Sequence, residues 1–153
     1  MDDKWRSDDG SAVVEFIFLS LLLLVPIVYL VLALAAVQSA AFAAEAVARD
    51  ASRAAVVGGV NALQEGATYA QAEAAGRERA AAAVQSTLAD FHVDLDDADV
   101  ELSCDADPCL TPGSNVAVEV TVRVALPGIG ALLPSAQVSV SSAGASPVDG
   151  YAP

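Results

Sequence analysis

The chain has 153 residues, of which 55% are hydrophobic and 18% charged, and its formal net charge is −13. This hydrophobic composition excludes an intrinsically disordered polymer, and 7 Lys and Arg against 20 Asp and Glu leave too little positive charge for a nucleic-acid-binding surface. One histidine, His92, and two cysteines are too few for a four-ligand zinc site and offer no evident catalytic constellation. We therefore expect a protein that needs no cofactor, does not bind nucleic acid and is not an enzyme.

An uncharged apolar segment runs from Phe16 to Val37, between Glu15 and the next charged residue, Glu45. Its 22 residues exceed the roughly 20 that a helix needs to cross a bilayer, whereas helices of globular domains average about 12. The segment predicts a transmembrane helix in contact with membrane lipid, which we assign to residues 11–37. Pro26 lies in its middle and is expected to kink it.

A cleaved secretory signal peptide is the alternative for this segment, because such a peptide also has an apolar run followed by a small-residue cleavage site. Ala33-Leu34-Ala35 and Ala41-Phe42-Ala43 both fit a site of that kind. However, the apolar run is longer than the roughly 7–15 residues of a signal peptide, and acidic residues outnumber basic ones before it. We therefore favour a retained membrane anchor.

The residues around the start of this segment, from Gly10 to Phe16, read Gly-Ser-Ala-Val-Val-Glu-Phe, and an alanine-rich stretch from Gln38 to Val56 follows the apolar run. This arrangement resembles type IV pilin-like proteins, in which a prepilin peptidase cuts after a glycine and a glutamate is the fifth residue of the mature chain. Within that superfamily it resembles the TadE-like proteins, minor pilin-like components of the tight-adherence (Flp) pilus machinery. The resemblance is strong over the first 57 residues and general beyond them.

The resemblance implies a leader peptide of residues 1–10 that is removed between Gly10 and Ser11. Because Gly10 has no side chain, the peptide bond after it can enter a narrow protease cleft in an extended conformation. Glu15 would then be the fifth residue of the mature chain. Glu15 and Phe16 would take part in subunit assembly. The Glu15 carboxylate would pair with the amino-terminal ammonium of a neighbouring subunit.

A function, partners and a location also follow from the resemblance. We expect a non-enzymatic minor pilin or assembly component of the Flp pilus, with prepilin peptidase, other pilin-like subunits and pilus assembly platform proteins as partners. It would be a single-pass protein of the cytoplasmic membrane with an extracytoplasmic C-terminal domain, and Lys4 and Arg6 favour a cytoplasmic amino terminus. Asp8 and Asp9 depart from the basic leader common in the family. The alternative function is a membrane-anchored or secreted binding module with no pilus role.

Residues 38–57 are expected to continue the membrane helix outward, because alanine has the highest helix propensity. Glu45 and Arg49 add a favourable i,i+4 pair, and Gly58-Gly59 predicts the end of the helix.

A linker and a second helix are assigned to residues 58–93. Thr68 and Gln71 have the spacing of a capping box, which predicts the start of an amphipathic helix. Its apolar face is predicted to contain Ala81, Val84, Leu88 and Phe91, and His92 is expected to be a solvent-facing or capping residue at its end.

The apolar period changes to two after position 94. The pattern is clearest from Val116 to Val124, where five valines share one face, and shorter runs extend from Val100 to Leu102 and from Gln137 to Ser141. Pro112-Gly113 and Pro127-Gly128 predict connections between these strands. We expect residues 94–143 to form a small antiparallel three-stranded sheet covered by the second helix, residues 144–153 to form a flexible tail, and the whole to be an α+β fold.

Cys104 and Cys109 are predicted to form a disulfide, because cysteine pairs oxidise in extracytoplasmic domains. A redox-active pair is less favoured, since the spacing is not Cys-x-x-Cys.

Seven acidic residues and no basic ones lie between Asp94 and Asp107. Neither Asp94 nor Asp97 as the first ligand places a glycine at the sixth position of an EF-hand loop. We therefore expect a solvated acidic face and no metal site, with calcium binding as the alternative.

Overall fold

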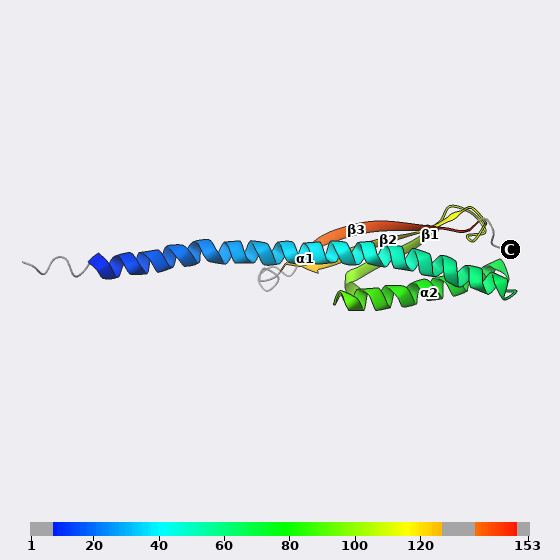
Figure 1. Ribbon diagram of the computed structural model, residues 1–153, viewed down its shortest axis with the longest axis horizontal. Coiled ribbons are helices and arrows are strands. Elements are labelled where there is room, and N and C mark those ends of the chain that lie inside the picture. Colours follow the sequence, from blue (N-terminus) through cyan, green and yellow to red (C-terminus); the bar gives the residue numbers. More distant parts are fainter. Residues whose placement is uncertain (1–7, 127–136, 150–153) are drawn as a thin grey trace, which may run out of the picture.

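The computed structural model describes residues 8–126 and 137–149 as one extended molecule with an α+β fold. A helical rod projects from one end, and a second helix and a three-stranded sheet pack along its other half (Figure 1). The predicted turn at Pro127-Gly128, most of the leader and the end of the chain lie outside the described residues. The elements are α1 (Asp8–Gln64), α2 (Tyr69–Asp90), the short 3-10 helix η1 (Leu95–Asp97), β1 (Ala98–Cys104), β2 (Asn115–Ala125) and β3 (Gln137–Pro147).

α1 joins the predicted membrane segment and its outward continuation in a single helix of 57 residues, about 86 Å long. Pro26 lies inside it and supplies no N–H to the helical ladder, but the helix continues on both sides. From Ala40 onward, α1 presents small residues to the rest of the protein, and Ala44, Val47 and Ala51 are fully buried. α1 therefore has an apolar half that projects and a second half that forms the centre of the packed domain.

The prediction that Gly58-Gly59 ends this helix was wrong, because α1 continues to Gln64. The two glycines instead make room for neighbours. A Cβ atom on Gly59 would lie 3.2 Å from the carbonyl oxygen of Ala72 and would overlap the side chain of Leu110. The missing side chains serve close packing here, and the helix tolerates their lower propensity because tertiary contacts stabilise it.

α2 begins with the predicted capping box. The Thr68 backbone N–H donates to Gln71 Oε1 at 2.9 Å, and the Gln71 N–H donates to Thr68 Oγ1 at 3.4 Å. The buried face differs in part from the prediction, since Ala81 is exposed and Phe91 is the half-buried C-cap. Small residues at intervals of four line the contact with α1 and let the two helices approach closely, with Val84 and Leu88 completing this face: Ala72, Gly76, Ala80, Val84 and Leu88. His92 is exposed, as predicted, and has φ 56°.

The three predicted strands form one antiparallel sheet in the order β1-β2-β3. β2 pairs along its full length with β3, from Asn115 opposite Pro147 to Ala125 opposite Gln137. Four of its valines face the helices and are 0–1% exposed: Val116, Val118, Val120 and Val122. The fifth, Val124, is partly buried. The alternation read from the sequence therefore identified the inner face of the sheet.

The cover on this face was assigned to the wrong helix. α1 packs against β2 and β3 and lies between the sheet and α2, which packs mainly on α1 (Figure 1). The sequence pattern favoured α2 because its apolar side chains are larger, but the alanine-rich face of α1 allows a closer approach to the sheet. The ideal Cβ position on Gly144 of β3 lies 2.7 Å from the carbonyl oxygen of Ala48.

β3 is also longer than predicted, since it reaches Pro147 and includes the first residues of the expected flexible tail. The serines, alanines and Gly144 in this segment gave a weak strand signal. They are held by pairing with β2 over eleven residues, and Val148, directly after the strand, is 1% exposed.

Candidate functional site

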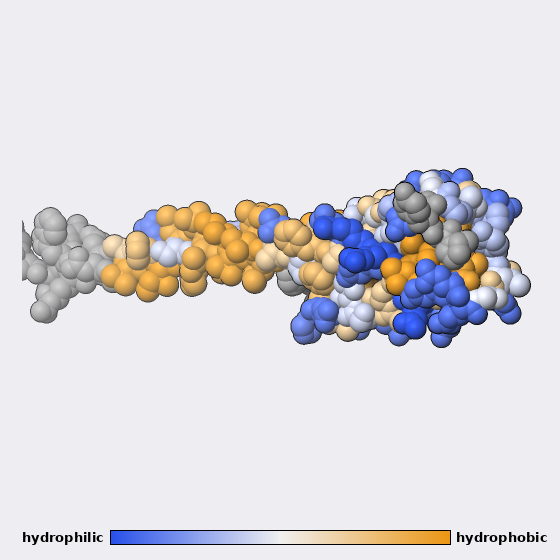
Figure 2. All heavy atoms as spheres, turned by 45° about the vertical axis from the view of Figure 1, so that its right-hand side comes forward, coloured by the Kyte–Doolittle hydropathy of each residue, from blue (hydrophilic) through white to orange (hydrophobic). Residues whose placement is uncertain are grey.

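The projecting half of α1 presents a continuous apolar surface. An 18-residue window within Ala12–Gln64 has a mean hydropathy of 2.9, and none of it is buried. Phe16 is 72% exposed, Leu23 67% and Leu34 56%. The space-filling view shows this apolar rod leading to a predominantly polar domain (Figure 2). The helix is long and apolar enough to cross a membrane once.

The predicted processing and assembly residues lie at the start of this rod. The backbone at Gly10 and Ser11 belongs to the first turns of α1, and Glu15 and Phe16 are exposed one turn further on. The structure therefore places all four on one helix. Cleavage after Gly10 requires this first turn to unwind, because proteases bind their substrates in extended form.

Glu15 stands at the beginning of the charge-free surface. Among the described residues the ion pairs are Arg49 with Glu45 and Arg123 with Asp99, so no cation in this part of the molecule neutralises Glu15. A carboxylate at the edge of a membrane segment is costly unless it reaches water or a counter-charge. A neutralising partner for Glu15 is therefore not supplied by residues 8–126 or 137–149.

The helical period relates the face of α1 that carries Glu15 to the face that is buried in the packed domain. At 3.6 residues per turn, Leu22, Ala33 and Ala40 lie on the same side of α1, at 7, 18 and 25 residues from Glu15. Ala40 is 3% exposed and faces the packed domain. By this period Glu15 lies on the same face of α1 as Ala40, which is buried where the helix enters the packed domain.

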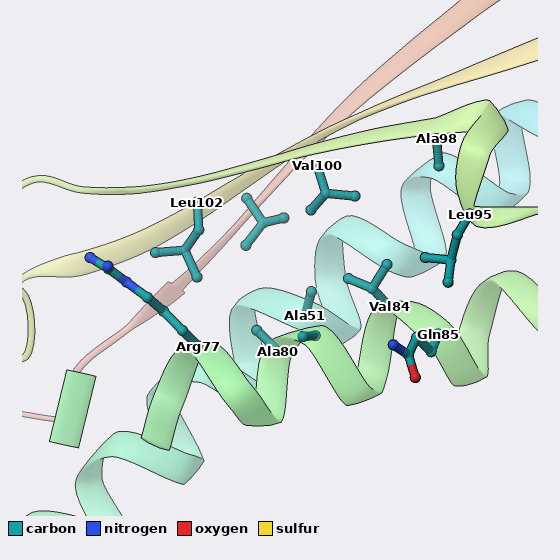
Figure 3. A pocket seen from close by; sticks show the side chains of 11 residues that line it. Ala51, Arg77, Ala80, Val84, Gln85, Leu95, Ala98, Val100 and Leu102 are labelled. Atoms are coloured by element: carbon teal, nitrogen blue, oxygen red, sulfur yellow. The ribbon is translucent and has the colours of Figure 1, made fainter. Parts of the chain in front are cut away.

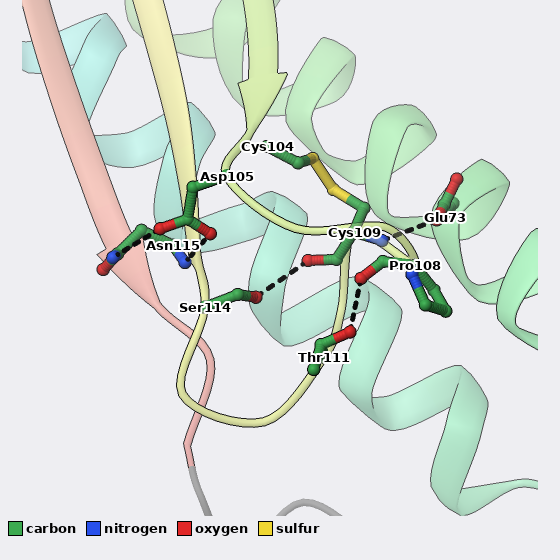
Figure 4. The surroundings of a disulfide bond; sticks show 8 residues. All are labelled: Glu73, Cys104, Asp105, Pro108, Cys109, Thr111, Ser114 and Asn115. Carbon is green, nitrogen blue, oxygen red and sulfur yellow. Dashed lines mark hydrogen bonds between the residues drawn. A yellow bond between two sulfur atoms is a disulfide. The ribbon is translucent and has the colours of Figure 1, made fainter.

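The predicted disulfide between Cys104 and Cys109 is present, with Cα atoms 5.3 Å apart. It joins the end of β1 to the β1–β2 connection, and this connection is held against α2 and by its own hydrogen bonds (Figure 4). The backbone N–H of Cys109 donates to the Glu73 carboxylate of α2 at 2.9 Å, and the Ser114 hydroxyl donates to the Cys109 carbonyl at 3.0 Å. Cys109 is 9% exposed, which favours a structural role.

The acidic run is largely exposed along β1 and the segment before it. Arg123 from β2 donates to the carboxylate of Asp99 at 2.7 Å and to the backbone carbonyl of Asp96 at 2.7 Å, which ties the start of β1 to the neighbouring strand. In the described ranges, no group of three or more His, Cys, Asp or Glu residues is arranged to hold a metal ion.

One carboxylate of this run, Asp105, is held by the backbone of the next strand. The backbone N–H of Asn115 donates to one of its oxygens at 2.7 Å, and the side-chain amide of Asn115 donates to the other at 2.9 Å. These two hydrogen bonds, the backbone one first, stabilise the charged form and lower the pKa of Asp105 below its usual value of 3.8. Asp105 therefore fixes the start of β2 through its hydrogen bonds to Asn115.

Comparisons of the chain with protein-family models, with curated proteins and with solved structures gave no match.

Proposed function

We propose that this chain is a TadE-like, pilin-like membrane subunit that acts without enzymatic activity in the biogenesis of a tight-adherence (Flp) pilus. In this proposal, α1 anchors it in the cytoplasmic membrane with the amino terminus in the cytoplasm and the packed domain outside. Prepilin peptidase removes residues 1–10, and the mature chain associates with other pilin-like subunits and assembly platform proteins.

The observation that carries the proposal is the continuity of α1. One helix contributes both the exposed apolar rod and the central packing surface of the domain, so no hinge separates the anchor from the domain among the described residues. A flexible tether would suffice for a protein that only needs to stay near the membrane. A continuous helix instead fixes the domain relative to its anchor, which suits a subunit that must be oriented and transmit force in an assembly.

The exposed rod also supplies the contacts that an assembly within the bilayer needs. Apolar side chains on neighbouring helices pack by van der Waals contact, because lipid provides no hydrophobic driving force between them. A new ammonium group at Ser11 would be an obvious partner for Glu15 of a neighbouring copy, because both charges are poorly solvated near the hydrocarbon. Assembly and processing would thereby depend on each other.

The secreted alternative conflicts with the packing of α1. Cleavage after Ala43 would cut the helix between two fully buried residues, Ala43 and Ala44, and would remove Ala40 from the core. Cleavage after Ala35 would leave the core residues but expose a helix end directly below them. The continuous helix therefore favours retention of the whole apolar segment.

The amino terminus of the mature protein tests the proposal most directly. Mass spectrometry of the full chain, purified from membranes of a host with an active prepilin peptidase, should give a product that begins at Ser11. A Gly10→Leu variant should retain the leader. A functional wild-type product that starts at Met1, or one that starts near Ala36 or Ala44, would contradict the proposal.

Glu15 provides the second test. A Glu15→Leu variant should insert and be cleaved normally but should fail to enter the pilus assembly, because the partner ammonium would lose its counter-charge. Glu45→Leu is the matched control, since it removes an exposed carboxylate from the same helix beyond the apolar segment. Crosslinking within isolated membranes measures assembly, and normal crosslinking of Glu15→Leu would refute the pairing.

A further inference from the structure

An apolar groove of about 330 Å³ lies between α2 and β1, with Ala51 of α1 at its floor. Val100 and Leu102 point into it from β1, and Ala80 and Val84 face them from α2 (Figure 3). Leu95 closes one end, and Arg77 lies near Leu102 as the one charged residue among those that line the groove in the described part of the chain. The surface of the groove is therefore mainly aliphatic, with Arg77 and Gln85 as its polar members.

Two apolar residues of the groove are much more exposed than the centre of the sheet beside them. Leu95 is 52% exposed and Val100 38%, whereas the inward-facing valines at the centre of β2 are 0–1% exposed. Covering these side chains would be favourable by about 25 cal/mol for each Å² of apolar surface removed from water. The groove is thus a place where the inner face of the sheet is incompletely covered.

The groove runs beside β1, which is an edge strand of the sheet in the described part of the chain. The strand order is β1-β2-β3, and within residues 8–126 and 137–149 no strand pairs with the free side of β1. Backbone groups on this side can accept an added strand. In β1, Ala98, Val100 and Leu102 face the groove, while Asp99, Glu101 and Ser103 face outward. An added strand would place alternate side chains over the groove and the others beside these carboxylates.

The negative charge around this edge favours a positively charged segment over a second copy of this chain. Asp94, Asp96, Asp99 and Glu101 are exposed here, and Arg123, bound to Asp99, is the one cation that contacts this group among the described residues. A second copy of this chain, with a net charge of −13, would meet electrostatic repulsion. An extended segment whose outer residues are Lys or Arg would instead face opposite charge, and cross-strand pairs of opposite charge stabilise sheets.

We propose that the edge of β1 and the adjoining groove form a docking site for an extended, basic segment of another protein. The segment adds to the sheet as a fourth strand, with apolar side chains in the groove and Lys or Arg side chains beside Glu101 and Asp99. This inference rests on the outer domain alone and goes beyond the proposed pilus function, so either can fail without the other.

A synthetic peptide with the sequence KVKVKVK is a suitable probe, because its seven residues match the length of β1. The full-length chain in detergent micelles, with labelled Val and Leu methyl groups, should show shifts at Val84, Leu95, Val100 and Leu102 when the peptide is added. The control peptide KKKKVVV has the same composition and charge but lacks the alternation. It should bind at least about tenfold more weakly.

Two variants locate the site. Glu101→Lys should weaken binding of KVKVKVK about tenfold by reversing a charge at the edge, whereas Glu65→Lys, the same change at the exposed tip between α1 and α2, should alter it less than about twofold. Val100→Ser should weaken binding without changing its dependence on salt, because it removes apolar contact and no charge.

Three results would overturn the inference. The first is equal binding of the two peptides, which would indicate attraction by charge alone. The second is a set of methyl shifts that maps to β3 or to the membrane half of α1. The third is a set of shifts at the groove that grows with protein concentration in the absence of peptide, which would identify a second copy as the occupant.

Discussion

At the scale of single residues, the close packing of the two helices depends on positions where a side chain is missing. A Cβ on Gly76 would lie 2.6 Å from the carbonyl oxygen of Ala55, which belongs to the backbone of α1 and cannot move aside. A Cβ on Gly58 would meet Cγ of Arg79 at 2.6 Å and Cβ of Arg79 at 2.9 Å, and it would lie 3.3 Å from the backbone oxygen of Ala75. Both glycines lie in helices at crowded positions, but only at Gly76 would the added Cβ come within 3 Å of a backbone atom.

We therefore expect Gly76→Ala to lower the free energy of unfolding more than Gly58→Ala does. Alanine improves helix propensity by about 1 kcal/mol at both positions, so this contribution cancels in the comparison. The remaining difference reflects overpacking against Ala55 and should be about 2 kcal/mol. Thermal unfolding of the two variants in the same detergent measures it. A Gly76→Ala variant as stable as Gly58→Ala would show that the helices separate without cost.

Asp105 gives a prediction about pH. Its pKa is lowered in the folded protein, so it stabilises the fold above the usual pKa of an aspartate, and this contribution is lost as the pH falls through the lowered value. An NMR titration should find Asp105 titrating below the reference value of 3.8. In Asn115→Ala the pKa should rise only part of the way, because the backbone N–H of residue 115 is the larger cause and remains. A full return to 3.8 would assign the effect to the amide side chain.

At the scale of elements, the disulfide holds the connection that joins β1 to β2. It closes a loop with a sequence separation of 5, for which the loss of unfolded-state entropy corresponds to about 2 kcal/mol. The double variant Cys104→Ala with Cys109→Ala should lower the free energy of unfolding by about this amount. Reduction of the wild-type protein should have the same effect and should not lower the stability of the double variant further. Denaturant unfolding, with and without reductant, provides the comparison.

Much of the element structure was predictable because it depends on local patterns. The charge-free segment, the capping box of Thr68 and Gln71, and the alternating valines of β2 each identified an element correctly. The failures involve residues whose role is set by distant neighbours. Gly58-Gly59 reads as a helix end in sequence but packs against Leu110 and α2, and Gly144 reads as part of a flexible tail but lies against Ala48. In the sequence, small residues suggest the end of a helix or strand. In the folded protein, the same residues allow two elements to approach closely.

The same reasoning explains how much of the candidate site could be predicted. The apolar surface of α1 and the Cys104–Cys109 bridge follow from composition and spacing, and the structure contains both. The groove beside β1 could not be predicted, because it depends on α2 packing mainly on α1 instead of on the sheet. The roles of Gly10, Ser11, Glu15 and Phe16 depend on other molecules and stay predictions.

At the scale of the whole molecule, α1 divides into two halves with different environments. In the first half, most large apolar side chains from Val13 to Leu34 are about half to three-quarters exposed, and Tyr29 is partly buried. The second half supplies the centre of the domain, where Ala44, Val47 and Ala51 are fully buried. A substitution on α1 should therefore affect either membrane insertion or folding according to its position, although both halves belong to one helix.

Leu23→Arg tests this division within the apolar half. A charge near the centre of a membrane helix costs about 2.5–3.5 kcal/mol in insertion. We expect a large fraction of the variant to be extracted from membranes by alkaline carbonate, whereas the wild-type chain stays in the pellet. The packed domain should keep its disulfide and its resistance to proteolysis, because Leu23 is 67% exposed and contributes nothing to the core.

Phe42→Arg is the matched control, since Phe42 is 62% exposed on the same helix but lies beyond the apolar segment. Both variants add one positive charge in place of a large apolar side chain, so they differ mainly in the position of the charge along α1. Phe42→Arg should remain in the carbonate-resistant pellet. If both variants are extracted alike, the boundary of the membrane segment lies further out than Val37. If neither is extracted, the apolar rod is buried against protein and not against lipid.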